Sequence, residues 1–259
     1  FSRCGAPVDY VLAEDLKNHP GDYRLYVFLN LFKCDRETVD AVRRLRERGA
    51  MIVWIYAPGY LNGNSPAGMK ELTGIDFAQT DGPGTAIVTM EDGRTMGTPG
   101  GEVERMFYPV RPDTVFGRYA DGHPGVAAVK VGSSVSVFSG VWQLDQEFIV
   151  RLVRESGAHV FCASGDPMEA NDSLFTLHAR FPGRKAIRLP RKVRTVVDVF
   201  GKSLVARDVD SFEFDAKLHS THLFYYGEDG EELLRKLNAG SNAEEDINAL
   251  CDALCTASR

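Results

Sequence analysis

The sequence lacks an apolar run approaching the roughly 20 residues that a membrane-spanning helix requires. It also lacks a positively charged start followed by an apolar core, so it shows no signal peptide. Because the chain begins at Phe1 and not at methionine, an upstream targeting segment is compatible with it. The sequence therefore argues against a membrane partner and leaves localisation open.

A surplus of basic residues is also absent. The chain carries 30 Lys and Arg against 36 Asp and Glu, a formal net charge of −6 at pH 7. A nucleic-acid-binding protein needs a concentrated basic face to neutralise phosphates, so the composition argues against a nucleic-acid partner. The basic stretches at 43–48 and 184–194 are interpreted as solvated surface.

The five cysteines form no C-x-x-C pair, and their odd number does not fit a small disulfide framework. Cys251 and Cys255 are one helical turn apart, a spacing that two metal ligands use. Leu250 and Leu254 make the same stretch an apolar stripe, however, and no histidine lies nearby. The sequence therefore predicts free thiols, with no metal site and no cofactor.

What the chain does contain is typical of a globular protein, with 44% hydrophobic and 25% charged residues over 259 positions. The segment 22–59 indicates a complete strand, helix, strand unit. Apolar runs at 25–29 and 51–57 are typical of strands covered on both faces. Between them we expect a helix that is capped by Asp35, packs Val39, Val42 and Leu45 inward and ends at Gly49.

A second unit of the same kind follows at 134–163. A strand at Ser134–Phe138 leads to a helix over Asp145–Ser156, and His159–Ala163 is expected to form the next buried strand. This alternation predicts a doubly wound α/β domain with a parallel sheet. Further expected elements are strands at 8–12, 86–90 and 103–110, a short helix near 69–72, and a hairpin of 126–131 with 134–138.

From Gly183 the pattern changes to short strands separated by turns, which indicates a small antiparallel β module of about 45 residues. Two amphipathic helices complete the chain. We therefore expect an α/β domain over 1–182, a small β domain over 183–227 and a helical extension over 228–259.

In open α/β sheets, ligands bind outside the carboxyl ends of the strands. The loop at 57–61 lies at such an end, and Tyr60 is its only large polar side chain. Tyr60 and Trp142 are the aromatic residues expected on loops at this edge. They suit sugar stacking or a subunit contact, and the alternative is simple packing over the sheet edge.

No nucleophile has a convincing setting. Cys34 precedes a helix but lacks a Gly-x-Cys-x-Gly elbow, and Cys162 lies within an expected buried strand. Ser139 ends a strand, with His159 or His178 as an imagined base, although a turn hydroxyl is the simpler interpretation. Asp166 has the residue type to bind sugar hydroxyls or accept a proton, yet a carboxylate between Gly and Pro is more typical of a turn. No catalytic residue is assigned.

Several short segments, in their order and spacing, resemble a known family. They are GAPVDYVLAEDL, DYRLYVFLN, RERGAMIVWIYAPGY, MKELTGI, SGDPMEAN, FTLHA, IRLP and THLFYYG. Together, over roughly Arg3 to Gly227, they resemble the C-terminal half of large bacterial glycoside-hydrolase-like proteins, related to the trimerisation domain of family forty-two β-galactosidases.

The resemblance implies a flavodoxin-like domain of the class I glutamine amidotransferase type that has lost its nucleophile, followed by a small β domain. It places the hydrolytic carboxylates in an upstream (β/α)₈ barrel of the same protein and implies a homotrimer in which this region shapes a neighbouring active site. It also implies a strand and most of a helix before Phe1, so we expect the chain to start inside the domain. The helices after Gly227 exceed the resemblance.

Two alternatives stay open at this stage. One is a divergent amidotransferase-like hydrolase that uses Ser139 or Cys34. The other is a carbohydrate-binding module that uses Tyr60, Trp142 and Asp166.

Overall fold

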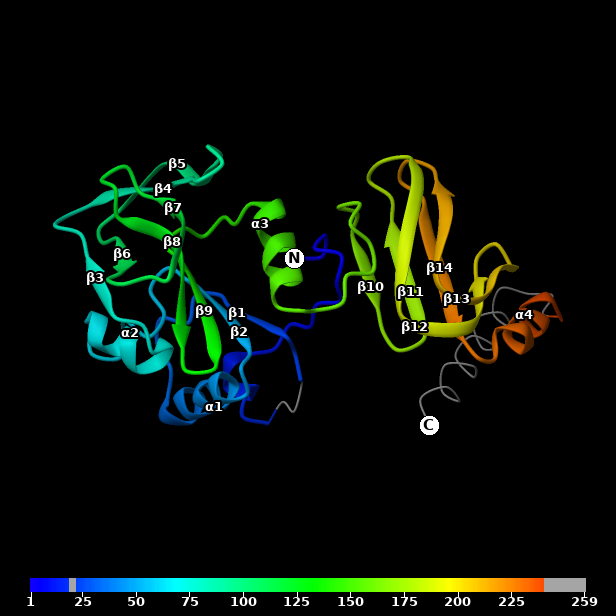
Figure 1. Ribbon diagram of the computed structural model, residues 1–259, viewed down its shortest axis with the longest axis horizontal. Helices are drawn as coiled ribbons and strands as arrows, with labels where there is room; N and C mark the ends of the chain where they lie inside the picture. The colour runs from blue at the N-terminus through cyan, green and yellow to red at the C-terminus, as the bar shows by residue number, and fades with distance from the viewer. Residues whose placement is uncertain (19–21, 240–259) are drawn as a thin grey trace. The chain divides into compact units, whose positions relative to one another are not determined.

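The computed structural model describes residues 1–18 and 22–239 (Figure 1), which form two compact units. One unit spans Tyr10–Ala158, and the other combines Phe1–Asp9 with the chain from His159 onward. The turn expected at 18–21 lies partly outside the described residues. So do the second C-terminal helix, Cys251 and Cys255.

The first unit is built on a seven-stranded sheet in the order β1-β2-β9-β8-β7-β4-β5. Its strands are β1 (Leu25–Phe28), β2 (Met51–Ile55), β4 (Gly84–Met90), β5 (Thr95–Val103), β7 (Thr114–Arg118), β8 (Pro124–Val131) and β9 (Ser134–Ser139). A separate pair is formed by β3 (Phe77–Gln79) and β6 (Phe107–Pro109). The helices are α1 (Arg36–Glu47), α2 (Pro66–Thr73) and α3 (Gln146–Glu155), with a 3₁₀ turn at Ala13–Asp15.

The predicted opening unit is confirmed. Strands β1 and β2 are parallel, and α1 connects them. The Asp35 carboxylate accepts a hydrogen bond from the Thr38 backbone N–H at 2.8 Å, as an N-cap does. The stripe of Val39, Val42 and Leu45 is buried in the same cluster as Trp54 of β2.

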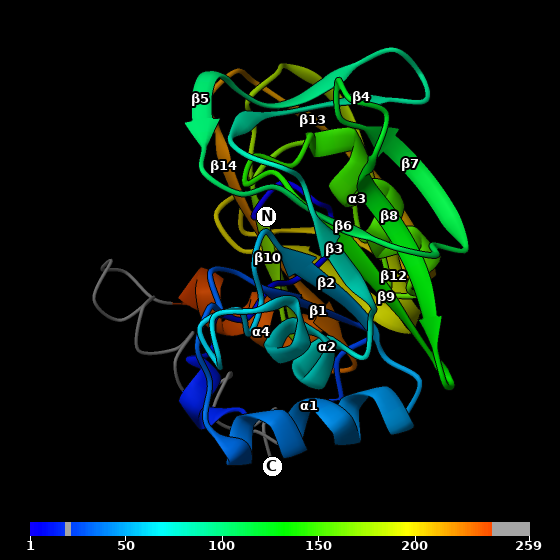
Figure 2. The same ribbon diagram turned by 90° about the vertical axis from the view of Figure 1, so that its left-hand side faces the viewer.

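Helices cover both faces of the sheet. The clusters of buried residues place α1 and α2 on one face, where Figure 2 shows them side by side, and α3 on the other. Only β1, β2 and β9 are mutually parallel, however, and every other neighbouring pair in the sheet is antiparallel. The sheet is therefore mixed, and the doubly wound, flavodoxin-like arrangement is not confirmed.

Two expected strands are wrong. Helix α3 forms with Asp145 as its cap, but His159–Ala163 does not become a strand, nor does Val8–Leu12. Phe161 and Cys162 are buried as predicted, yet they lie in the core of the other unit, where the Phe161 N–H donates to the Gly5 carbonyl. An apolar run indicates that a segment is buried but does not determine its backbone conformation, and the backbone of this segment is irregular. The strand expected over 103–110 is also interrupted, because β5 ends at Val103 and β6 begins at Phe107.

The second unit is an antiparallel sheet in the order β10-β11-β14-β12-β13. Its elements are β10 (Met168–Ala170), β11 (Leu174–His178), β12 (Gly183–Asp198), β13 (Ser203–Ala216), β14 (Thr221–Gly227) and α4 (Gly230–Ala239). Short strands expected within 185–199 and 204–214 merge into the long β12–β13 hairpin. Because β10 and β11 belong to the same sheet, the expected boundary at 182/183 falls inside this unit.

Residues from two faces stabilise this sheet. Phe175, Phe224 and Tyr226 belong to the larger core, whereas Tyr225 lies with Leu233 and Leu237 of α4. The first of the two helices expected at the C-terminus is thus packed on the sheet. No helix in the described ranges is long and apolar enough to cross a membrane.

Candidate functional site

The carboxyl ends of two of the three parallel strands, β1 and β2, are followed by unusual backbone. Asn30 follows β1 with φ of 54°, and Tyr56 follows β2 with φ of 63°. Non-glycine residues adopt this left-handed region at a cost of roughly 1–2 kcal/mol, and such strain persists where surrounding contacts enforce it. Contacts made by the surrounding residues therefore hold the backbone at this edge in a conformation that it does not favour by itself.

The side chains at this end form a continuous group of rings, which we call the aromatic edge: Phe32, Tyr56, Tyr60, Phe107 and Trp142. The Tyr56 ring lies 4.4 Å from the Trp142 ring, 5.8 Å from the Phe107 ring and 6.1 Å from the Phe32 ring, between centroids. Tyr60 joins through Phe107 at 5.1 Å. Tyr56 is thus the centre of the aromatic edge.

Polar contacts fix the same group. The Tyr56 hydroxyl donates a hydrogen bond to the Arg105 carbonyl at 2.9 Å, and the Arg105 guanidinium lies 5.9 Å from the Tyr60 ring centroid. Burial raises the pKa of Tyr56, so its hydroxyl remains a donor at neutral pH. The edge is therefore a set of rings with one cation beside it.

The aromatic edge is exposed in part. Trp142 is 41% exposed, and Leu29 and Leu61, on the loops after β1 and β2, are 53% and 50% exposed. The loops bearing these leucines are joined by backbone hydrogen bonds, from the Gly59 N–H to the Leu31 carbonyl and from the Leu61 N–H to the Phe32 carbonyl. These exposed apolar side chains all follow strands at the carboxyl end of the sheet, and exposed apolar patches on a soluble domain are typical of contact or ligand sites.

Tyr60 and Trp142, chosen from the sequence, are therefore brought into one cluster. Sequence reasoning missed Tyr56, because it extended the strand to Ala57, whereas β2 ends at Ile55. The available signal was position, since Tyr56 is the first residue after the end of a parallel strand. Phe107 was missed because it lies on β6, far away in the sequence.

Ser139 lies at the end of β9 and is fully buried. Its hydroxyl donates to the Val141 carbonyl at 2.8 Å, which is a local turn contact. His159 and His178 belong to the other unit, where their ring nitrogens contact the Arg188 carbonyl and the Thr221 hydroxyl. This geometry supports the turn-hydroxyl interpretation of Ser139.

Asp166 is also buried, and a cation neutralises it. Its carboxylate accepts from the Lys185 ammonium at 2.6 Å, from the Arg180 backbone N–H at 2.7 Å and from the Ser164 hydroxyl. Burial by itself would raise the pKa of Asp166, but the hydrogen bonds outweigh burial, so that pKa lies below its usual value. A buried carboxylate held in this way is an internal structural group.

The cysteine thiols have similarly ordinary settings. The Asn62 amide donates to the Cys34 sulfur at 3.2 Å, and partial burial raises the pKa of Cys34, which disfavours a thiolate. Cys162 is buried beside the Ser164 hydroxyl. Within residues 1–18 and 22–239, no group of three or more His, Cys, Asp or Glu side chains could hold a metal ion.

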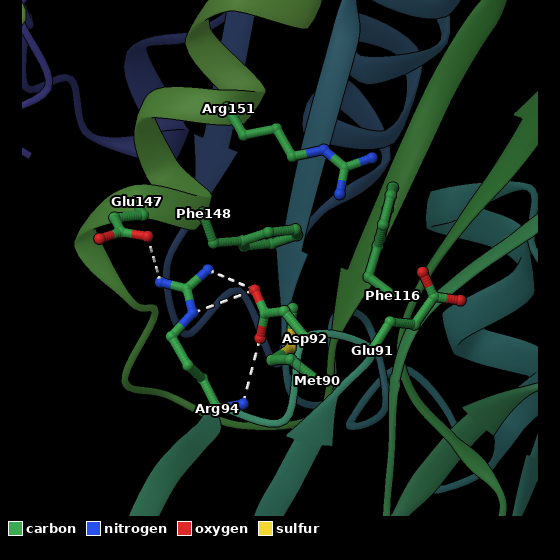
Figure 3. A pocket seen from close by; sticks show the side chains of 8 residues that line it. All are labelled: Met90, Glu91, Asp92, Arg94, Phe116, Glu147, Phe148 and Arg151. Atoms are coloured by element: carbon green, nitrogen blue, oxygen red, sulfur yellow. Dashed lines mark hydrogen bonds and ion pairs between the residues drawn. The ribbon is translucent and has the colours of Figure 1, made fainter.

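A pocket of about 310 Å³ lies between the β4–β5 turn and α3 (Figure 3). Arg94 crosses it and pairs with Asp92 at 2.6 Å and with Asp145 and Glu147 at 2.7 Å each. The Asp92 hydrogen bond, with the other carboxylates, raises the pKa of Arg94 further. Arg151 is stacked 4.7 Å from the Phe116 ring centroid. The ion pairs of Arg94 therefore link the β4–β5 hairpin to the start of α3.

Neither a protein-family model nor a curated protein matches the sequence. Solved structures do match the fold. A GH42 β-galactosidase from G. stearothermophilus superposes with a TM-score of 0.59 at 17% identity, over 87% of this chain and 34% of its own. β-Galactosidases from Bacillus circulans sp. alkalophilus and Rahnella sp. R3 have TM-scores of 0.55 and 0.53 at 12% and 15% identity.

The latter two matches cover 79% and 86% of this chain but only 33% and 35% of the β-galactosidase chains. This chain therefore spans about a third of the length of the proteins whose fold it shares. At these identities the likeness concerns the fold alone. The chain has the fold of a part of a GH42 β-galactosidase.

Proposed function

We propose that this chain is a non-catalytic region of a glycoside-hydrolase-like protein, and that its aromatic edge contributes to assembly and shapes a neighbouring active site. The observation that carries the proposal is the shared fold with one third of GH42 β-galactosidase chains. The partially exposed Trp142, with exposed Leu29 and Leu61 on the loops after β1 and β2, is proposed as the surface.

The chemistry of the described residues supports a non-catalytic role. Glycoside hydrolysis needs two carboxylates at a controlled separation across one bond. Asp166, the carboxylate singled out from the sequence, is withdrawn from solvent and paired with Lys185. Acyl transfer needs an activated nucleophile, and the hydroxyl of Ser139 and the thiol of Cys34 are both engaged in local hydrogen bonds.

The partners follow from the family resemblance. The proposed partner is an upstream (β/α)₈ catalytic domain of the same protein, acting on a β-galactoside, and the proposed assembly is a homotrimer. On this view the unit Tyr10–Ala158 is a divergent relative of the amidotransferase-like trimerisation domain. Exposed Leu29 and Leu61 would be covered by protein in the assembled state, where burial of apolar area favours association.

The test is the mass of the intact protein by light scattering. A Leu29→Ser/Leu61→Ser variant should shift the oligomer toward smaller species, because it removes exposed apolar area from the proposed contact. Phe200→Ala, which removes a 63% exposed ring from the other unit, serves as the matched control. A monomeric intact protein at every accessible concentration would refute the assembly role.

A further inference from the structure

The two tryptophans of the chain have opposite environments. Trp54 is fully buried, stacked on Phe28 at 4.8 Å, and its indole N–H donates to the Ser136 hydroxyl. Trp142 is 41% exposed and touches the Tyr56 ring at a centroid distance of 4.4 Å. The indole of Trp142 is therefore a large apolar ring that packs against Tyr56 and is also accessible to a ligand.

Tyr56, which packs against Trp142, adopts an unfavourable backbone conformation. Tyr56 has left-handed backbone with φ of 63°, and its hydroxyl is tied to the Arg105 carbonyl. Strained residues held by several contacts are typical of sites where a side chain must be placed accurately. Tyr56 is thus a positioning residue, and the group it positions is the Trp142 indole.

Polar groups of both kinds lie on the same edge. The Arg105 side chain is 47% exposed and the Glu104 side chain 90% exposed, and the two are paired only loosely, at 3.5 Å. A guanidinium donates hydrogen bonds and a carboxylate accepts them, which suits hydroxyl groups that do both. Because the two charges are opposite, the edge favours a neutral ligand.

We propose that Trp142, positioned by Tyr56, stacks against the sugar ring of a neutral galactopyranoside, whose hydroxyls reach Arg105 and Glu104. The C–H groups on one face of that sugar form a flat apolar surface that matches an indole, while its rim is polar. This inference rests on the proposed function for the choice of sugar. It assigns the aromatic edge a direct role in substrate binding beyond assembly.

The experiment uses the 259-residue chain and acrylamide quenching of tryptophan fluorescence. Because Trp54 is fully buried, the quencher reports on Trp142. Methyl β-D-galactopyranoside should lower the quenching constant in a saturable manner, with a millimolar dissociation constant. Glycerol at the same concentration, a polyol without a ring face, should not. No protection by the sugar, or equal protection by glycerol, would overturn the proposal.

Variants provide the second arm, with saturation-transfer NMR of the sugar protons as the readout. Trp142→Ala should weaken binding about tenfold, whereas Phe200→Ala, the exposed-ring control, should leave it unchanged. Equal signals from both variants would contradict the assignment, and if Trp142→Ala does not fold, the quenching titration decides alone. The oligomer mass tests assembly separately, so failure of sugar binding and failure of the proposed function are distinguishable.

Discussion

The Lys185 ammonium lies 2.6 Å from the Asp166 carboxylate, and the two side chains are only 4% and 0% exposed. The pair connects the loop before β10 to the start of β12. A buried ion pair of this kind contributes little net stability compared with apolar residues, but removal of one partner leaves an uncompensated charge. The segment SGDPMEAN, which holds the candidate site residue Asp166, therefore contains an internal structural contact.

The first prediction follows from this asymmetry. Asp166→Ala should destabilise the chain by about 3–5 kcal/mol, because the Lys185 charge would remain buried without a partner. The double variant Asp166→Leu/Lys185→Met should cost much less, since it removes both charges and fills a similar volume. Urea unfolding followed by far-UV circular dichroism measures both. Equal losses in the two variants would show that the pair is not the cause.

The second prediction concerns pH. The pKa of Asp166 is lowered in the folded state, so the stabilisation linked to its ionisation is complete above its unfolded value of about 3.9. It is lost as the pH falls through the lower folded value. Unfolding free energies should therefore fall more steeply in acid for the natural chain than for Asp166→Leu/Lys185→Met. Parallel pH profiles would contradict the assignment.

The third prediction tests the packing of α1. Leu45 is 6% exposed in the cluster that contains Trp54, so Leu45→Ala should cost about 2–5 kcal/mol by loss of burial and creation of a cavity. Arg43→Ala on the same helix is the control, because that side chain is 46% exposed. Urea unfolding monitored by tryptophan fluorescence measures the difference. Unchanged stability of Leu45→Ala would mean that the helix face is misplaced.

The parts of the fold that the sequence predicted share a physical basis. Helix α1 has a capping Asp35, a regular apolar stripe and a terminal Gly49, so local and tertiary signals agree. The segment 159–163 has only an apolar run, which is compatible with any buried backbone. Only Phe161 and Cys162 of this segment are buried, and its expected strand conformation is wrong, because Phe161 packs in a core assembled from distant strands.

The candidate site shows the same division. The carboxyl-end rule located Tyr60 and Trp142, since it depends only on topology. The strained backbone of Tyr56 and the ring of Phe107 depend on tertiary contacts that no local pattern contains. Lys185 did leave a signal, because it shares the inward phase of Ile187 and Leu189 along β12. A charged residue at an inward position predicts a buried partner.

The fourth prediction is an absence of turnover. This chain alone should hydrolyse neither glutamine nor an aryl glycoside, because Ser139 and Cys34 lack an activating base in their described surroundings. Assays of the purified chain beside Ser139→Ala and Cys34→Ala give the measurement. Activity that disappears in either variant would establish a nucleophile and refute the non-catalytic proposal.

The fifth prediction concerns Gly140, which follows β9 and precedes the Trp142 loop. A Cβ atom at Gly140 would lie 1.5 Å from the Tyr119 hydroxyl oxygen and 2.7 Å from its ring carbon. Tyr119 is 3% exposed, and its hydroxyl donates to the Phe107 carbonyl, so it has little room to move. Gly140→Ala should therefore cost at least about 1–3 kcal/mol by overpacking.

A double-mutant cycle isolates that contact. Tyr119→Phe removes the nearest atom, so Gly140→Ala should cost less in the Tyr119→Phe background, with only partial relief because the ring carbon stays close. Gly101→Ala is the control. The nearest atom to its Cβ would be the Thr98 backbone oxygen at 3.3 Å, so this variant should cost less than Gly140→Ala. Because Gly140 leads directly into the loop of Trp142, acrylamide quenching should also change in Gly140→Ala. Additive costs in the cycle would show that Tyr119 does not limit the space at Gly140.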